Sequence, residues 1–210
     1  MTRTTKSQPT DPSIAPELDS LEQLAAAIDA CHGCPLWERA THAVPGAGPA
    51  HGKLMFVGEQ PGDQEDLAGV PFVGPAGKLL DKALVEAGIA RDEVFVTNAV
   101  KHFSWTPRGT RRLHKTPTER EITACMGWLE GEIRLLRPAV VVCLGATAVR
   151  AVLGPGVKVL VNRGRFFKTD LAARVLITVH PSSILRGAPE DRERAFAQFV
   201  QDLAHIKEAL

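Results

Sequence analysis

Four short apolar runs recur along the chain, and each ends in a turn. They read KLMFVG at residues 53–58, EVFVTNAV at 93–100, AVVVCLG at 139–145 and RVLITVHP at 174–181. Apolar residues follow one another in these runs with few polar residues between them, and many are β-branched. This pattern is typical of strands buried on both faces, as in a parallel sheet whose two sides are covered by helices.

Segments with apolar residues at helical spacing lie between and around these runs. The first, within residues 18–31, has Asp19 or Ser20 as a capping residue at its start. The others lie at residues 76–88, 116–136, 146–154 and 189–210, and Gly88, Pro138 and Gly154 end the first three of them. The alternation of strands and helices predicts an α/β fold, a three-layer α/β/α sandwich with a mostly parallel, four-stranded central sheet.

The pattern also predicts the domain organisation. Residues 1–16 are rich in Thr, Ser, Pro and Lys, which predicts a flexible N-terminal tail. Residues 17–210 show neither an internal repeat nor a linker, and a length of 210 residues suits one domain with one site. In a parallel sheet this site is expected beyond the carboxyl ends of the strands.

Composition narrows the class of protein but does not define its chemistry. Apolar residues make up 44% and charged residues 23%, as in ordinary globular proteins, and the net charge of +1 excludes a uniformly basic coat for nucleic acid. A polyanionic partner would therefore have to bind at local clusters of Lys and Arg. The chain shows no apolar run of membrane-spanning length and no signal segment, so we expect a cytoplasmic protein without a membrane partner.

The cysteines point to a metal centre or to core packing rather than to disulfides, because the cytosol keeps thiols reduced. Cys31 and Cys34 form a C-x2-C pair, which fits zinc, redox or iron–sulfur chemistry, although its place after a helix disfavours thioredoxin chemistry. Cys125 offers a third thiol and His102 the best fourth ligand. Cys143 lies inside an apolar run and is interpreted as a core thiol. The spacing alone leaves zinc and a cluster both open.

The loop after the first strand, GEQPGDQED at residues 58–66, is dense in polar side chains. Its carboxylates can act as general acid or base or bind a metal, and its glycines let the backbone approach a ligand closely. We interpret Glu65 and Asp66, in contrast, as a solvated acidic turn. The later GPAGK segment is not a phosphate loop, because that motif needs four residues between its glycines and a Ser or Thr after the Lys.

Two further segments carry a histidine. HPSSILRG at residues 180–187 follows the last strand, and its histidine can donate a hydrogen bond to a developing anion. Its hydroxyls and arginine suit a phosphate, although Ser before a helix is also a common cap. The segment WTPRGTRRLHKTPTERE at residues 105–121 places His114 in a loop among arginines and a lysine. From the residues alone, such a histidine more often faces phosphate or solvent than takes part in chemistry.

Several motifs together resemble the iron–sulfur, family 4-like branch of the uracil-DNA glycosylase superfamily, over roughly Cys31 to the C-terminus. They are GEQPGDQED, PFVGPAGKLLD, VTNAVKHF, RRLHKTP, LGATA and HPSSILRG. Three departures from the ordinary branch make the chain most similar to the X-type branch, uracil-DNA glycosylase X. Gln60 takes the place of an alanine, His102 takes the place of a cluster cysteine, and the inserted GTRRLH supplies an arginine–histidine loop.

The resemblance implies that the substrate is uracil in DNA, flipped out of the base stack, with free uracil as a product. Phe72 is then expected to stack on the uracil, Asn98 to read its edge, and His180 to stabilise the uracil anion as it leaves. The residues expected near DNA phosphates are Ser182, Ser183 and Arg186. We also expect a monomer and a preference for single-stranded DNA.

For the chemical step, the X-type resemblance implies that His114 captures C1′ of the sugar and remains covalently attached to the DNA. Glu59 is the expected partner of the imidazole. Together, Glu59, Gln60 and Asp63 surround the sugar, whose positive charge a carboxylate can stabilise.

The resemblance also assigns tasks to the neighbouring cations and to the cysteines. The arginines before His114, Arg111 and Arg112, are expected to anchor phosphates and to favour the neutral imidazole. The ligands of a structural 4Fe–4S cluster would be Cys31, Cys34, His102 and Cys125. Two alternatives remain, a conventional turnover iron–sulfur uracil-DNA glycosylase that leaves an abasic site, and a non-catalytic iron–sulfur DNA-binding protein.

Overall fold

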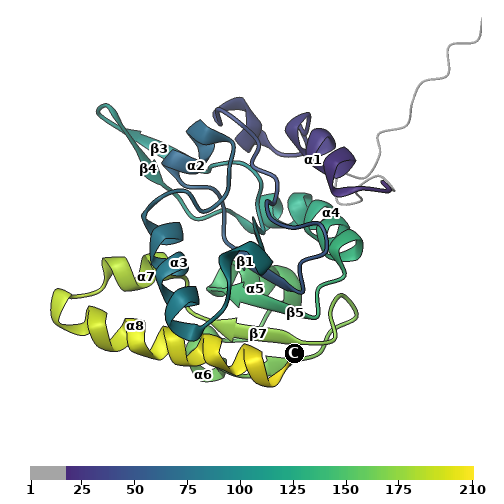
Figure 1. Ribbon diagram of the computed structural model, residues 1–210. Helices are drawn as coiled ribbons and strands as arrows, with labels where there is room; N and C mark the ends of the chain where they lie inside the picture. Colours follow the sequence, from purple (N-terminus) through teal and green to yellow (C-terminus); the bar gives the residue numbers. More distant parts are fainter. Residues whose placement is uncertain (1–17) are drawn as a thin grey trace, which may run out of the picture.

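A computed structural model describes residues 18–210 (Figure 1). The expected tail at residues 1–16 lies outside this described part of the chain. Helices cover both faces of a central sheet, which gives the three layers that the sequence predicts. The sheet has the strand order β2-β1-β5-β7-β6.

The four predicted apolar runs form the parallel strands of this sheet. They are β1 (Leu54–Gly58), β2 (Val94–Asn98), β5 (Val140–Leu144) and β7 (Val175–Thr178), and every residue in them is buried. β1 pairs in parallel with β2 and β5, and β5 pairs in parallel with β7. The sheet is mostly parallel, as predicted, but has one strand more than the four expected. This strand, β6 (Phe166–Phe167), pairs antiparallel with β7.

The five predicted helical segments all contain a helix. The α-helices of the described residues are α1 (Leu21–Asp29), α2 (Asp63–Ala68), α3 (Pro75–Ala87), α4 (Glu119–Leu136), α5 (Ala146–Leu153), α6 (Val159–Asn162), α7 (Pro181–Arg186) and α8 (Pro189–Ala204). Short 3-10 helices lie at η1 (Pro35–Glu38), η2 (Arg91–Glu93) and η3 (His205–Glu208). Of the two candidate caps of α1, Ser20 is the one whose hydroxyl accepts a hydrogen bond, from the amide of Gln23.

The side chains of successive residues in a buried strand point to opposite faces of the sheet. On β1, Phe56 packs into the apolar cluster that includes residues of α3 and α8. Its neighbours Met55 and Val57 pack on the other side, with residues of α4 and α5. Both faces are covered, and this is why polar residues do not alternate with apolar ones along these runs.

The segment that contains His114 forms a β-hairpin rather than the expected loop. β3 (Trp105–Arg108) pairs antiparallel with β4 (Arg111–His114), and Gly109 in the turn has a φ of 60°, which favours glycine. Trp105 is opposite His114, so His114 lies at the base of the hairpin and Arg111 at its tip. Figure 1 shows the hairpin projecting from the body beside α2. Within residues 18–210, no helix is both long and apolar enough to cross a membrane.

Candidate active site

The parallel strands bring predicted site residues to one edge of the sheet. Glu59 directly follows β1, Asn98 ends β2, and His180 lies between β7 and α7. A cavity of about 390 Å³ opens at this edge. The predicted site residues that line it are Gln60, Asp63, Phe72, Asn98, His114, His180, Ser182 and Arg186.

Phe72 is held with little freedom at this cavity. Its φ is 58°, in a region that bulky residues rarely adopt and that is often found at functional sites. Two glycines make room for it. A Cβ on Gly77 would lie 1.7 Å from the carbonyl oxygen of Phe72, and a Cβ on Gly58 would lie 2.8 Å from Cζ of its ring and 2.4 Å from Oδ1 of Asn98. Ring and amide therefore stand side by side at the end of β1.

A buried ion pair supports the backbone of Asn98. Lys101 is fully buried, and its ammonium donates to the carbonyl oxygen of Asn98 at 2.7 Å and to the carboxylate of Glu132 at 2.8 Å. The hydroxyl of Thr97 donates to the same carboxylate. Sequence reasoning missed this support, although a lysine inside the apolar stretch after a buried strand is a signal, because such a residue is seldom buried without a partner.

His180 is fixed in one neutral tautomer. The backbone amide of Ser182 donates to Nδ1 at 3.1 Å, and the Ser182 hydroxyl lies 2.8 Å from the same nitrogen. A nitrogen that accepts an amide hydrogen bond carries no proton, so the proton of the neutral ring is on Nε2. Burial, together with the charge of Arg186 and the neighbouring His114, lowers the pKa of His180 to about 4. The ring is thus a neutral hydrogen-bond donor at pH 7.

His114 and Glu59 form a pair beside this imidazole. Nε2 of His114 lies 3.3 Å from one carboxylate oxygen of Glu59, and the other oxygen accepts a 2.5 Å hydrogen bond from the hydroxyl of Thr147 on α5. Burial lowers the pKa of His114, the carboxylate of Glu59 opposes this, and Arg186 adds to the lowering. A neutral imidazole next to a carboxylate has a nucleophilic nitrogen. Sequence reasoning missed Thr147, whose signal was its place just after β5.

The side chain of Gln60 forms hydrogen bonds at the base of the hairpin rather than with His114 or Glu59. Its side-chain oxygen accepts from the amide of Ser104, just before β3, at 3.0 Å. Its side-chain nitrogen donates to the carbonyl oxygens of Ser104 and Lys115, each at 3.1 Å. Ser104 and Lys115 flank the two strands, so Gln60 clamps the base of the hairpin at the residue that follows His114.

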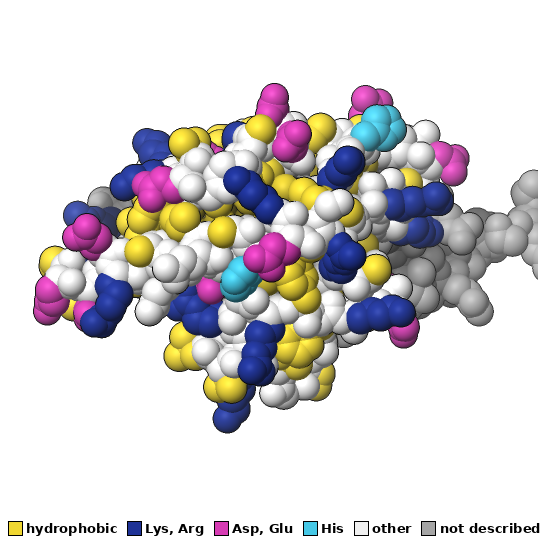
Figure 2. All heavy atoms as spheres, turned by 60° about the horizontal axis from the view of Figure 1, so that its bottom comes forward, with side chains coloured by type: hydrophobic (Ala, Val, Ile, Leu, Met, Phe, Trp, Pro, Cys, Tyr) yellow, Lys and Arg dark blue, Asp and Glu magenta, His cyan; other side chains and the backbone are white. Residues whose placement is uncertain are grey.

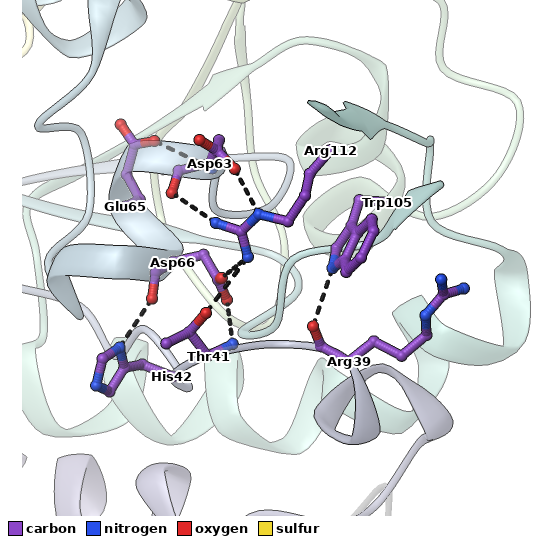
Figure 3. A network of polar contacts seen from close by, with 9 residues as sticks. Arg39, Thr41, His42, Asp63, Glu65, Asp66, Trp105 and Arg112 are labelled. Carbon is purple, nitrogen blue, oxygen red and sulfur yellow. Dashed lines mark hydrogen bonds and ion pairs between the residues drawn. The ribbon is translucent and has the colours of Figure 1, made fainter. Parts of the chain in front are cut away.

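Arg112 is committed to carboxylates within the chain (Figure 3). Its guanidinium donates to Asp63 at 2.6 Å and to Asp66 at 2.5 Å, and it lies over the rings of Phe103 and Trp105. These carboxylates hold the pKa of Arg112 above its ordinary value, although burial opposes them. This ion pair fastens the hairpin to α2.

The interpretation of Glu65 and Asp66 as a solvated turn was wrong. Both belong to α2 and are buried, with exposed fractions of 8% and 0%. Glu65 accepts hydrogen bonds from the amides of Gly62 and Gly74, and Asp66 accepts one from the amide of Thr41 in addition to the Arg112 pair. The buried charge of Glu65 is matched by nearby backbone donors, and that of Asp66 by donors from distant parts of the chain.

The remaining residues predicted to contact DNA differ in whether they line the cavity. Ser182 and Arg186 line it, on the exposed side of α7. Ser183 donates its hydroxyl to the carbonyl oxygen of His180 at 2.7 Å, so it serves the helix start that the sequence allowed as an alternative. Arg111 is exposed at the hairpin tip and lies outside the lining of this cavity.

Three of the four predicted metal ligands lie together. The neighbouring thiol of Cys125 lowers the pKa of Cys34 to about 5 against the effect of burial, and His102 adds to this lowering. Cys34, together with burial, raises the pKa of Cys125. The sulfur of Cys31 accepts a 3.2 Å hydrogen bond from the indole of Trp128, one turn beyond Cys125 on α4.

The donor atoms of these residues are ones that a metal centre accepts. Within residues 18–210, no group of three or more His, Cys, Asp or Glu side chains is spaced to hold a single metal ion. Nδ1 of His102, however, is buried without a hydrogen-bond partner, a state that is costly unless a ligand satisfies it. Three thiols and an imidazole are ligands that cluster iron accepts. Cys143 is fully buried in β5, as predicted, and burial raises its pKa.

Comparison with known proteins places this arrangement in a family. The profile of the family described as the Uracil DNA glycosylase superfamily matches residues 45–204. The chain is 38% identical over 176 residues to a Type-4 uracil-DNA glycosylase of Sulfurisphaera tokodaii, covering 80% of this chain and 77% of that relative. It is 36% identical over 183 residues to the Type-4 enzyme of Thermotoga maritima, covering 86% and 91%. A Type-5 uracil-DNA glycosylase of Pyrobaculum aerophilum is 32% identical over 168 residues, covering 70% and 69%.

The matched span and the site coincide. Residues 45–204 contain every residue that lines the cavity, as well as His102 and Cys125, whereas Cys31 and Cys34 precede the span. The two Type-4 relatives extend the similarity over more than three quarters of this chain. The chain therefore belongs to the uracil DNA glycosylase superfamily.

Proposed function

We propose that this protein is an X-type uracil-DNA glycosylase, which excises uracil from DNA and then remains attached through His114 to C1′ of the sugar. Membership of the superfamily and the Type-4 relatives support the glycosylase activity. The observation that carries the covalent endpoint is the place of His114. Its neutral imidazole lies at the cavity wall with Nε2 against Glu59, so we assign the bond to carbon to Nδ1.

The cavity supplies groups for a flipped uracil. Phe72 offers an aromatic face on which the base stacks, and the side-chain amide of Asn98 offers a donor and an acceptor for the edge of the pyrimidine. His180 presents its Nε2 proton to a carbonyl oxygen of the base. The backbone strain at Phe72 is consistent with a ring that must keep one orientation.

Bond cleavage uses the same groups. As the bond between C1′ and N1 of uracil breaks, its electron pair moves onto the base, and His180 stabilises the resulting negative charge as a neutral donor. A protonated His180 would give a stronger acid but would lose the hydrogen bond from Ser182 to Nδ1. Positive charge develops on the sugar, where the carboxylate of Glu59 stabilises it.

His114 then completes the reaction. The nitrogen that does not face Glu59 donates its lone pair to C1′ and forms a C–N bond, so the ring becomes positively charged. The proton on the other nitrogen is next to Glu59 and passes to that carboxylate or to solvent, which leaves a neutral, alkylated imidazole. The released uracil anion takes up a proton and leaves. Because the new bond replaces the attack of water, each protein molecule reacts once.

In the proposal, the ion pair between Asp63 and Arg112 positions the hairpin that carries His114. Asp63 is paired with Arg112, so its charge is directed to the hairpin rather than to the sugar. We assign the phosphates of the DNA to Ser182, Arg186 and the exposed Arg111. The uncommitted guanidinium groups can release counterions on binding, whereas the paired Arg112 cannot.

A 4Fe–4S cluster held by Cys31, Cys34, His102 and Cys125 would complete the protein. The buried Nδ1 of His102 and the contact between Cys34 and Cys125 support this ligand set. Such a group would crosslink separate segments of the chain and supply no step of the reaction, and Cys31 and Cys34 would hold α1 to the rest of the molecule.

The test is to mix the protein with single-stranded DNA that contains one uracil and to separate the products on a denaturing gel. We expect a band of lower mobility that requires uracil and is absent from His114→Ser. His114→Ser should instead leave DNA with an alkali-labile abasic site, because water then captures C1′. Double-stranded DNA with the same uracil tests the strand preference, and we expect slower adduct formation there.

Two controls give the outcomes their meaning. The same DNA with thymine in place of uracil must give no adduct. Abasic DNA in excess over wild-type protein, with no shifted band, would establish a turnover enzyme and overturn the covalent endpoint. Intact DNA with folded, iron-containing protein would overturn the glycosylase activity itself.

A further inference from the structure

We propose that a second cavity, next to the uracil cavity, binds the base of the nucleotide that adjoins the uracil. This inference rests on the proposed function, because it assumes that the uracil lies in the first cavity. The second cavity has a volume of about 610 Å³, against about 390 Å³ for the first. It lies between the edge of the sheet, α6 and α7.

The two cavities adjoin one another and share five lining residues. The residues that line both are Gln60, His114, His180, Ser182 and Arg186. DNA is a polymer, so a nucleotide with its base in the first cavity and C1′ at His114 must continue into the neighbouring space. The second cavity opens at His114, and the adjoining nucleotide is the part of the substrate nearest to it.

The walls of the second cavity suit a base more than a phosphate. One side is apolar and consists of Leu144, Val159, Leu160 and Val179. Leu160 is 76% exposed and gains burial only when something covers it. The flat face of a nucleobase is apolar and packs on such a surface, irrespective of which base it is. Arg186 and Ser183 line the same cavity and provide partners for the phosphate that joins the two nucleotides.

Charge around α6 fits a nucleic acid strand. Lys158 precedes α6 and Arg165 follows it, and both are exposed. Figure 1 places α6 at the lower edge of the molecule, and Figure 2 turns that edge forward. On this face, apolar side chains lie among charged side chains of both signs, Lys and Arg as well as Asp and Glu. Cations interleaved with apolar surface are typical of grooves that hold single strands.

The experiment measures binding separately from chemistry. The probe is a fluorescent single-stranded oligonucleotide in which the uracil nucleotide carries a 2′-fluorine, which disfavours positive charge on the sugar and so prevents cleavage. Three versions are compared by anisotropy: the parent, one with an abasic spacer directly 5′ of the uracil, and one with the spacer directly 3′. We expect the Kd of the full-length protein to rise roughly tenfold for one of the two spacers, as the loss of one packed base predicts.

Two substitutions in the same helix then locate the effect. Leu160→Gln should weaken binding of the parent and should lose the sensitivity to the spacer. Val161→Gln is the matched control, because Val161 is 69% exposed in the same helix but lies outside the cavity lining. It should keep both the wild-type Kd and the full sensitivity.

The outcomes separate this inference from the proposed function. If neither spacer changes the Kd of the wild-type protein, or if Leu160→Gln and Val161→Gln respond alike, the second cavity does not bind the adjoining base. The proposed function fails instead if thymine in place of uracil leaves the Kd unchanged.

Discussion

His180 has a protonation state that its surroundings impose. Burial lowers its pKa to about 4, with contributions from Arg186 and His114. In an unfolded chain a histidine takes up a proton at about pH 6.5. Between about pH 6.5 and about pH 4, the folded chain therefore binds fewer protons at this residue than the unfolded chain, and the free energy of unfolding falls as the pH is lowered through this range.

Replacing His180 by Asn should remove this dependence. We expect wild-type protein to lose about 2 kcal/mol more unfolding free energy than His180→Asn between about pH 7.5 and about pH 5. Urea unfolding followed by circular dichroism at the two pH values measures the difference. His51 is exposed, so His51→Asn should keep the wild-type dependence. Equal losses in wild type and His180→Asn would mean that His180 ionises in the folded chain as it does in the unfolded chain.

Individual residues could be placed from sequence where they follow a strand. Glu59, Asn98 and His180 lie together because the carboxyl ends of parallel strands meet at one edge of the sheet. The burial of Asp66 could not be predicted, since its partner Arg112 lies 46 residues further along the chain. An acidic side chain in a loop is solvated unless such a donor reaches it, and only the folded hairpin brings this one.

The hairpin is the element on which the covalent step depends in our proposal. His114 ends β4, and Gln60 holds the next residue and the start of β3 through three hydrogen bonds. Gln60→Met keeps the volume but removes these bonds. A displaced nucleophile can lose on the order of 100-fold in rate. We therefore expect adduct formation to fall by roughly that factor, while uracil release falls far less, so that free abasic DNA accumulates.

Two measurements on the same reaction test this expectation. Adduct is quantified on a denaturing gel and free abasic DNA by alkaline cleavage of the DNA that stays free, and total uracil release is the sum of the two. Gln201→Met is the control, because Gln201 is exposed on α8, remote in sequence from the hairpin. Equal losses of adduct and of uracil release in Gln60→Met would indicate a general disturbance of the site and contradict a positioning role.

At the scale of elements, sequence patterns predicted what is buried and regular. The strands and long helices follow from runs and periodicities that their own residues carry. The hairpin was missed because Pro107, Gly109 and exposed arginines resemble a loop, and its strands have hardly any apolar face. Its order comes from the Gln60 clamp and from Arg112, contacts with parts of the chain more than 40 residues away. β6 has only two residues, too few for any period.

The whole molecule divides into a sandwich with its own core and an N-terminal part with a small one. The two large apolar clusters lie on the two faces of the sheet. α1 contributes to a separate cluster whose buried members are Leu24, Ile28 and Ala43. So few buried side chains give limited stabilisation, and a bound group that joins Cys31 and Cys34 to α4 would add to it. The sequence suggested these ligands but not how little else holds α1.

The cluster proposal therefore predicts a loss of both iron and stability when one ligand is removed. In Cys34→Ala, we expect the iron content and the visible absorbance of the purified protein to fall strongly. The thermal unfolding midpoint should fall by roughly 5 to 10 °C, because several kcal/mol of binding energy stabilise the folded chain. Cys143→Ala is the matched control. It also removes one thiol, but Cys143 is buried in β5, away from the four candidate ligands. It should keep its iron and absorbance even where the lost packing lowers the midpoint. A Cys34→Ala protein that retains the iron of the wild type would exclude Cys34 from the ligand set, whatever its stability.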